Sequence, residues 1–281
     1  MTAFDRYSSG IPRETHPAVT VIAGDFADRS KLADAIHGQD NVFHFLSTTS
    51  PSTAEADPSY DLRSNVIPTV EMLSLCVYAG VDHIYFASSG GAIYGDYGTE
   101  LHAENDATRP RSPYAVGKLA IEGYLEYFHA VHGLDYTSLR ISNPYGPRQH
   151  RQKQQGLIPI ALRSIAAGKP VTRYGDGGMT RDYIHVEDAV RMILDIVGGT
   201  PRHAIYNIGS GSAHSVNDVL DAIAEVVGRP FDIVARPTPK SFVESSVLDI
   251  TRFSDEFGVP RLRTLHDGIA DTWSAVEDEN A

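Results

Sequence analysis

A tyrosine and a lysine four positions apart, Tyr114 and Lys118, are suited to proton-transfer chemistry. Apolar residues follow at helical spacing, so the pair is expected on one face of a helix that ends at Gly133. A free phenol has a pKa of about 10, and a neighbouring ammonium lowers that pKa because it stabilises the phenolate. Such a phenol can act as a general base for an alcohol proton. The spacing also arises by chance on amphipathic helices, so the assignment depends on the flanking Ser112-Pro113 and on motifs elsewhere.

Short apolar strands alternate with helical patterns through the first half of the chain. Strands are predicted over residues 3–5, 19–25, 41–46, 83–88 and 135–141, and helices over 30–37, 62–80 and 114–133. This alternation predicts an α/β fold, a Rossmann-type doubly wound parallel sheet covered on both faces. Ligands of such sheets bind beyond the carboxyl ends of the strands. The polar residues at these ends include Asp5, Asp25, Ser47, Ser88-Ser89 and Asn143.

The composition of the sequence changes after Asn143. A turn-rich loop over 144–149 leads into a basic, glutamine-rich patch over 148–155. Helices are predicted over 157–168, 187–197 and 216–227, strands over 181–186 and 204–208, and an irregular C-terminal part after these. We therefore predict a Rossmann-like domain over 1–146 and a smaller mixed α/β lobe over 147–281, with segments that return to the sheet.

Composition limits the classes of partner. The chain has 281 residues and a net charge of −12, which argues against general binding to nucleic acid. No apolar run is long enough to span a bilayer and no signal peptide is recognisable, so a membrane partner is not expected. The single cysteine, Cys76, cannot form an intramolecular disulfide and fits a reducing cytoplasm.

Two further features favour ordinary structural explanations. His129 and His132 lie on the helix predicted after Tyr114, without carboxylate or cysteine partners, so we expect a surface position and no metal site. Gly209-Ser210-Gly211 follows a strand, but no third glycine comes at the spacing of a dinucleotide fingerprint. We therefore predict a turn there.

Taken together, the motifs resemble NAD-dependent nucleotide-sugar epimerases and dehydratases of the UDP-glucose 4-epimerase type, which are extended short-chain dehydrogenase/reductases. The matching stretches run in family order over nearly the whole chain. They are residues 4–5, 24–25, 43–46, 65–69, 88–95, the Tyr114/Lys118 pair, 140–149, 175–188 and 206–209.

The resemblance implies NAD as cofactor. Its contacts would be Asp5 at the adenosine ribose, Asp25 and Phe26 beside the adenine, Phe45, Leu46 and Ser47 along the pyrophosphate and nicotinamide ribose, and Asn65, Ser88, Tyr114, Lys118 and Ile141. An aspartate directly after a strand is also a common turn or cap residue, and this structural role is the alternative for Asp5 and Asp25.

The resemblance also implies a catalytic set and a substrate set. Tyr114 would be the base, Lys118 would lower its pKa, and Ser89 would assist, with Ser88 as the alternative hydroxyl. Ser89, Tyr114, Asn143, Arg148 and Arg181 would contact the nucleotide sugar. Arginine offers a planar fork for phosphate oxygens, although Arg148 and Arg181 could equally be solvated.

Three positions depart from the family pattern. The family opens with a strand, a Gly-x-x-Gly-x-x-Gly turn and a helix that faces the cofactor pyrophosphate, whereas this chain begins at what matches the second strand. We therefore expect either a late-placed start or a truncated protein that binds NAD weakly. The hydroxyl that often stands four residues before Tyr94 is replaced by Gly90. An upstream substrate arginine has no clean match, and Arg236 and Lys240 are the nearest candidates.

The reaction can be narrowed from the same motif. Dehydratase relatives carry an acidic pair where this chain has Gly91 and Ala92, and elimination of water needs an acid and a base. The resemblance therefore implies a UDP-hexose 4-epimerase that works through a 4-keto sugar. The alternatives are a single-step nucleotide-sugar oxidoreductase and a truncated, cofactor-poor relative that has a binding or scaffold role or no activity. Relatives pair through two long helices, here 62–80 and 114–132, so a homodimer is expected.

Overall fold

A computed structural model describes residues 1–7, 16–95, 101–149, 155–239 and 242–279. The chain forms two compact units. The first contains residues 1–88 and 112–138, and the second contains residues 89–111 and 139–281. This partition by contacts differs from the functional division predicted at residue 146, which remains a prediction.

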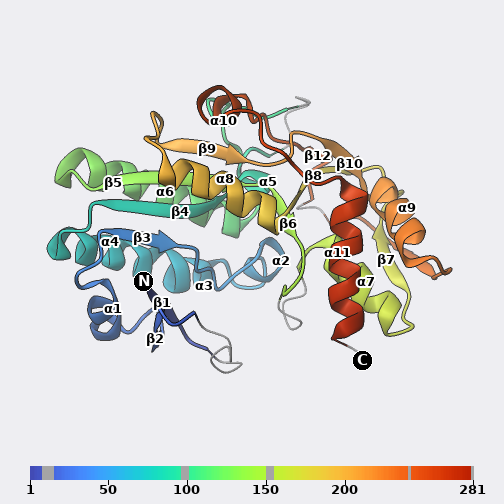
Figure 1. Ribbon diagram of the computed structural model, residues 1–281, viewed down its shortest axis with the longest axis horizontal. Coiled ribbons are helices and arrows are strands. Elements are labelled where there is room, and N and C mark those ends of the chain that lie inside the picture. Colours follow the sequence, from blue (N-terminus) through green and yellow to red (C-terminus); the bar gives the residue numbers. More distant parts are fainter. Residues whose placement is uncertain (8–15, 96–100, 150–154, 240–241, 280–281) are drawn as a thin grey trace. The chain divides into compact units, whose positions relative to one another are not determined.

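The strands of the first unit are parallel. β1 (Thr2–Asp5) pairs with β2 (Thr20–Ala23), and β3 (Asn41–His44) pairs with β4 (His83–Ser89). β5 (Asp135–Ile141) is the next neighbour of β4 and runs on into the second unit. All five strands predicted for this half of the chain are present, although β3 ends at His44 rather than at residue 46. The predicted α/β class is confirmed, and Figure 1 shows β3 and β4 side by side.

Helices connect these strands. They are α1 (Arg29–Ile36), α2 (Pro51–Ala54), α3 (Pro58–Asp61), the π-helical turn η1 (Leu62–Val66), α4 (Ile67–Ala79) and α6 (Pro113–His132). The predicted helix over 62–80 therefore begins with a π turn, a feature frequent at functional sites. α4 and α6 end on Gly80 and Gly133, whose φ values of +73° and +71° are easiest for glycine.

The second unit is built around β8. Its elements are α5 (Gly90–Ile93), β6 (Asn143–Tyr145), α7 (Leu157–Ala166), β7 (Val171–Tyr174), β8 (Thr180–His185), α8 (Val186–Gly198), β9 (Ile205–Ile208), β10 (Ala213–Ser215), α9 (Val216–Val227), β11 (Ile233–Arg236), β12 (Ser245–Ser246), α10 (Thr251–Phe257) and α11 (Leu265–Asp278). β8 pairs in parallel with β6 and β12 and antiparallel with β10. β7 pairs with β11, and β9 follows β5 in the strand order.

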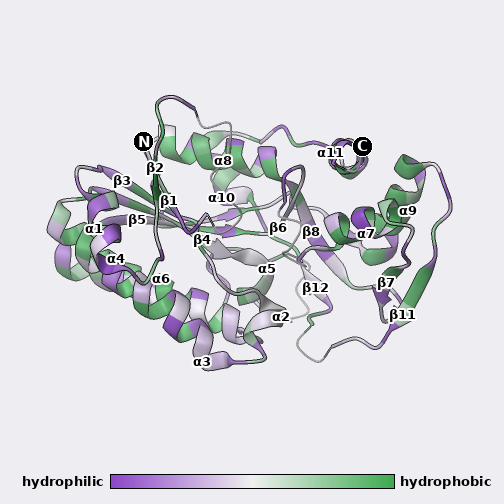
Figure 2. Ribbon diagram, turned by 90° about the horizontal axis from the view of Figure 1, so that it is seen from below, coloured by the Kyte–Doolittle hydropathy of each residue, from purple (hydrophilic) through white to green (hydrophobic). Residues whose placement is uncertain are grey.

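The core of this unit lies among α7, α9 and α11, where Leu162, Leu220 and Ile269 are buried. Figure 2 shows hydrophobic and hydrophilic segments alternating along α8, as expected for a helix with one buried face. The C-terminal part was predicted to be irregular, and this prediction is wrong because α10 and α11 lie there.

The helical signals of α11 can be read in the sequence. The Thr264 side chain caps the helix by accepting a hydrogen bond from the Asp267 amide. Ile269, Trp273 and Val276 then recur at helical spacing and are buried.

Two structural predictions made from the sequence are confirmed. Gly209-Ser210-Gly211 lies in the turn between β9 and β10, where the Asp182 carboxylate accepts hydrogen bonds from the Ser210 and Gly211 amides. His129 and His132 are exposed on α6, as predicted. The expectation that His129 lacks a carboxylate partner is wrong, because its Nδ1 lies 3.2 Å from Asp135 Oδ1. In the part of the chain that the structure describes, every helix is too short or too polar to cross a membrane.

Gly90 generates a prediction about stability. A Cβ at this position would lie 2.5 Å from Leu248 Cδ1 and 2.8 Å from the Arg140 carbonyl oxygen. Gly90→Ser should therefore lower the free energy of unfolding by about 1–3 kcal/mol through overpacking, as measured by urea denaturation. Gly91→Ala is the matched control, because its Cβ would lie 3.4 Å from the Asn143 amide, where a small shift suffices. Wild-type stability in Gly90→Ser would contradict the close packing.

Candidate functional site

Helix α6 places Tyr114 and Lys118 on one face, as predicted. The Ser112 hydroxyl accepts a hydrogen bond from the Ala115 amide at 3.2 Å and fixes the start of the helix, with Pro113 as its first residue. Lys118 Nζ lies 5.7 Å from the centroid of the Tyr114 ring. The phenol and the ammonium can therefore influence each other electrostatically.

The Lys118 ammonium is removed from water. Lys118 is 7% exposed, and its Nζ donates a hydrogen bond of 2.7 Å to the Ala87 carbonyl of β4. Nζ also lies 4.7 Å from the centroid of the Phe86 ring. Burial lowers the pKa of Lys118 to about 8, while the nearby carboxylates of Asp61 and Glu122 oppose that change.

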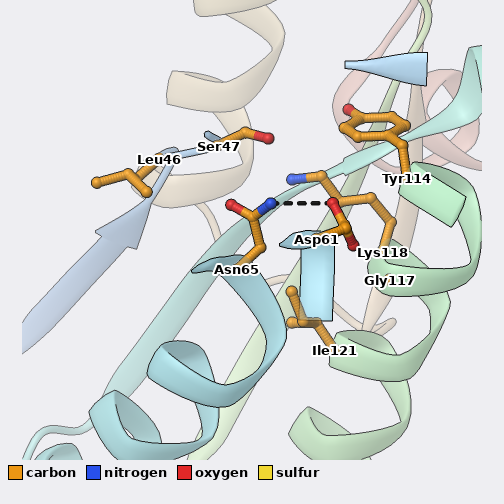
Figure 3. Close-up of a pocket in the computed structure, with 8 residues that line it drawn as sticks. All are labelled: Leu46, Ser47, Asp61, Asn65, Tyr114, Gly117, Lys118 and Ile121. Carbon is orange, nitrogen blue, oxygen red and sulfur yellow. Dashed lines mark hydrogen bonds between the residues drawn. The ribbon is translucent and has the colours of Figure 1, made fainter. Parts of the chain in front are cut away.

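These two residues line a pocket within the first unit (Figure 3). The lining residues are Leu46, Ser47, Asp61, Asn65, Tyr114, Gly117, Lys118 and Ile121. The pocket thus brings together predicted residues from the segment after β3, from η1 and from α6. Predicted cofactor residues that are distant in the sequence lie around the same Tyr–Lys pair.

Asn65 holds one wall of this pocket. Its Nδ2 donates hydrogen bonds of 2.9 Å to Asp61 Oδ1 and to Thr49 Oγ1, and its Oδ1 accepts one of 2.9 Å from the Thr48 amide. The side chain therefore ties η1 to the segment after β3. The buried Asn65 amide therefore stabilises this wall of the pocket, and its contact with a cofactor remains a prediction.

Asp5 is the last residue of β1, and Asp25 comes two residues after the end of the neighbouring strand β2. The Gly24 amide donates to the Asp5 carbonyl at 3.0 Å, which joins the two ends. Each aspartate accepts a hydrogen bond of 2.9 Å from a backbone amide two residues later, and Asp25 Oδ2 lies 3.7 Å from the Arg6 guanidinium. Both thus form the turns named above as the structural alternative, and their role toward a cofactor remains a prediction.

The two predicted phenylalanines differ in exposure. Phe26 is a core side chain, 6% exposed and stacked on His44 with 5.2 Å between ring centroids. Phe45 is half-exposed and meets Phe43 edge to face at 6.0 Å. A ligand can therefore contact the Phe45 ring, whereas the Phe26 ring is almost entirely covered by protein.

The two candidate hydroxyls also differ. Ser88 is buried in the first unit, and its hydroxyl donates to Glu122 Oε1 at 2.5 Å. Ser89 belongs to the second unit and precedes α5 without a side-chain capping hydrogen bond. The Ser88 hydroxyl therefore has a structural partner, and Ser89 remains the predicted assistant.

The predicted substrate residues other than Tyr114 lie in the second unit, as does Ile141 at the end of β5. Asn143 Nδ2 donates to the Asp182 carbonyl at 2.9 Å. Arg181 donates to the Val243 and Thr180 carbonyls at 2.7 Å each, and so links β8 to the segment before β12.

Arg148 is exposed and has a φ of +67°, which is uncommon for a residue other than glycine. Among the candidates for an upstream arginine, Arg236 ends β11 and is exposed, and Lys240 lies outside the described residues.

Three residues around Lys118 were missed by the sequence analysis. Glu122 is one turn after Lys118 on α6, so the spacing that identified Tyr114 and Lys118 could also have identified it. Asp61 belongs to α3, and no sequence spacing links it to Lys118. Gly117 makes room for Asp61, because a Cβ at this position would overlap Asp61 Oδ2.

The comparisons with known proteins agree with this fold. The profile of the "NAD dependent epimerase/dehydratase family" matches residues 1–209. A UDP-glucose 4-epimerase of Mycolicibacterium smegmatis is 33% identical over 231 residues, which cover 82% of this chain and 74% of that protein.

Two solved structures extend the likeness to the whole fold. The UDP-glucose 4-epimerase of Thermotoga maritima with UDP-glucose is 29% identical, with a TM-score of 0.93 over 100% of this chain and 91% of that one. The UDP-glucose 4-epimerase of Thermus thermophilus in complex with NAD is 30% identical, with a TM-score of 0.91 over 98% of this chain and 90% of that one. With the family profile matching most of its length, this chain belongs to the NAD dependent epimerase/dehydratase family.

Proposed function

We propose that the protein is an NAD-dependent epimerase that inverts C4 of a UDP-hexose through a 4-keto sugar. The observation that carries the proposal is the Lys118 ammonium, buried beside Tyr114 in a pocket that Leu46, Ser47 and Asn65 also line. The similarity to UDP-glucose 4-epimerases supports the choice of substrate class.

The residues of the first unit fit NAD. The buried ammonium of Lys118 has more donor capacity than its bond to Ala87 uses, and a ribose hydroxyl is a suitable acceptor. Ser47 and Asn65 add polar groups at the same pocket. We assign Asp5 and Asp25 to the adenosine end and the Leu46–Asn65 pocket to the nicotinamide ribose. When bound, NAD supplies the acceptor for the hydrogen at the sugar carbon.

Tyr114 takes the proton of the sugar 4-hydroxyl in this mechanism. The nearby Lys118 ammonium favours the phenolate, which makes Tyr114 a better base. Ser89 contributes a hydroxyl to the same sugar. We assign Asn143, Arg148 and Arg181 to the nucleotide diphosphate. The exposed guanidinium fork of Arg148 matches phosphate oxygens, whereas both terminal nitrogens of Arg181 already donate to backbone carbonyls. A firmly held diphosphate lets the 4-keto sugar turn within the site and present its other face.

Helix α5 favours epimerisation over elimination of water. Gly91 and Ala92 lie on α5, at positions where the resemblance implies an acidic pair in dehydratases. Elimination needs an acid and a base beside the leaving group, and neither residue can provide one.

Tyr114→Phe should remove turnover without unfolding the protein. Loss of a general base costs about 10²- to 10⁴-fold in kcat, and the ring of Phe preserves the packing on α6. The measurement is conversion of UDP-glucose to UDP-galactose, with circular dichroism to check the fold. Tyr124→Phe, an exposed tyrosine on the same helix, is the control and should retain activity. A near-normal kcat in Tyr114→Phe would remove Tyr114 from this role.

The fate of the hydrogen at C4 tests the function itself. With deuterium at C4 of the UDP-sugar, mass spectrometry should find the label retained at C4 of the epimer, because a cofactor that stays bound through both half-reactions returns it to the same carbon. Label lost to added NAD would indicate a single-step oxidoreductase. If no UDP-sugar or dTDP-sugar is converted, the proposal fails and a binding role is favoured.

We further propose a homodimer in the cytoplasm, where the single cysteine suits reducing conditions. Helix α6 carries exposed apolar residues at spacings of three, four and eight: Val116, Tyr124, Tyr127 and Val131. Helix α4 of the same unit adds Ile67 and Tyr78. Such a patch on neighbouring helices is suited to a second copy of the chain.

A charge in this patch should separate the subunits. Val131 is 57% exposed, and Val131→Glu should shift the mass in analytical ultracentrifugation from twice 30.6 kDa toward the monomer. Val259→Glu is the control, because Val259 is 87% exposed before α11 and lies outside the patch. A monomeric wild-type protein, or an unchanged dimer in Val131→Glu, would contradict the proposed interface.

A further inference from the structure

Charged and titratable side chains from three elements surround Lys118. Asp61 comes from α3, Tyr114 and Glu122 come from α6, and His44 comes from β3. Burial and the Lys118 charge lower the pKa of His44 to about 3, so this imidazole is neutral at working pH. The two carboxylates are therefore the groups of this set that can compensate the buried ammonium.

Asp61 is fixed in position by several contacts. It is 2% exposed, and its Oδ1 accepts hydrogen bonds from the Thr49 hydroxyl and, at 2.9 Å, from Asn65 Nδ2. Its Oδ2 lies against the α6 backbone at Gly117, where a Cβ would overlap it. Figure 3 shows the carboxylate of Asp61 between Asn65 and Lys118. A carboxylate held in this way cannot swing out to water.

Glu122 lies one helical turn after Lys118 on α6. It is 8% exposed, and its Oε1 accepts the 2.5 Å hydrogen bond from the Ser88 hydroxyl. The ammonium thus lies near two buried carboxylates, each oriented by a neutral hydrogen-bond donor.

A buried ammonium is costly, and without a partner of opposite charge a lysine in such a place releases its proton. We propose that Asp61 is a positioning residue of the reaction, which together with Glu122 keeps Lys118 charged and in place beside Tyr114. The inference rests on the proposed role of Tyr114 and Lys118. Asp61 itself acts through Lys118, and Gly117 is the residue that permits its approach.

The direction of the pH effect follows from the charges. Asp61 and Glu122 both raise the pKa of Lys118 against the larger lowering by burial. Removal of either charge lets Lys118 lose its proton at a lower pH. Above that pH the phenolate of Tyr114 loses its cation, so the alkaline limb of the activity profile moves to lower pH.

Lysine NMR tests the proposal without reference to turnover. The chain contains five lysines, so protein labelled with ¹³C at lysine Cε gives few signals, and Lys118→Arg assigns the one of interest. The wild-type signal of Lys118 should titrate near pH 8. In Asp61→Asn the midpoint should fall by about one pH unit or more, and Glu122→Gln should change it in the same direction.

Asp57→Asn is the matched control. Asp57 caps α3 four residues before Asp61 and is half-exposed, and asparagine caps a helix as well as aspartate. This variant should leave the Lys118 midpoint unchanged. If Asp61→Asn fails to fold, Gly117→Ala is the second variant, since the added methyl displaces the Asp61 carboxylate and should also lower the midpoint.

Activity then links the charge to the reaction. At pH 9 the kcat of Asp61→Asn should be about tenfold or more below that of the wild type. At a pH above the Lys118 midpoint, lowering that midpoint by one unit lowers the charged fraction of Lys118 about tenfold. At pH 6 the difference should be smaller, and KM should stay within about threefold.

An unchanged Lys118 midpoint in folded Asp61→Asn or Gly117→Ala would overturn the proposal, whatever the activity. Full activity in Tyr114→Phe would instead overturn the proposed function and leave the Asp61–Lys118 coupling measurable by NMR. The two failures can therefore be distinguished.

Discussion

The burial of one ammonium group, that of Lys118, is the constraint on which the candidate site depends. The group donates to the Ala87 carbonyl of β4 and lies over the Phe86 ring, so strand β4 and helix α6 must keep their mutual placement within the first unit. A buried cation is tolerated only when it is hydrogen-bonded and compensated. The carboxylates of Asp61 on α3 and Glu122 on α6 supply the compensating negative charge.

The local structure around this group follows from the same requirement. The π turn η1 places Asn65 where its amide can bind Asp61, Thr48 and Thr49 together. Gly117 leaves the space that the Asp61 carboxylate fills. The Ser112 cap and Pro113 set the start of α6, and so set where Tyr114 stands relative to Lys118. The positions of the predicted base and its ammonium partner therefore depend on how α6 begins and on the small side chain at Gly117.

The sequence predicted the elements that have local signals. The five strands, the glycine ends of α4 and α6 and the turn at 209–211 could be read from spacing and composition. Helix α11 could also have been read, from Thr264 and the spacing of Ile269 and Trp273. Asp61 could not be predicted beside Lys118, because tertiary packing and not sequence spacing joins α3 to α6. The hydrogen bonds of Arg181 to backbone carbonyls could not be predicted either, because they also depend on tertiary packing.

Lys118 is the residue that makes Tyr114 a base, and the ultraviolet absorbance of the phenolate measures this effect on Tyr114 itself. The chain has 14 tyrosines, so the titration of Tyr114 is obtained as the difference between wild type and Tyr114→Phe. We expect the midpoint of Tyr114 to lie clearly below the value of about 10 for a free phenol, and to rise in Lys118→Met. A midpoint at about 10 or above that does not respond to Lys118→Met would contradict this expectation.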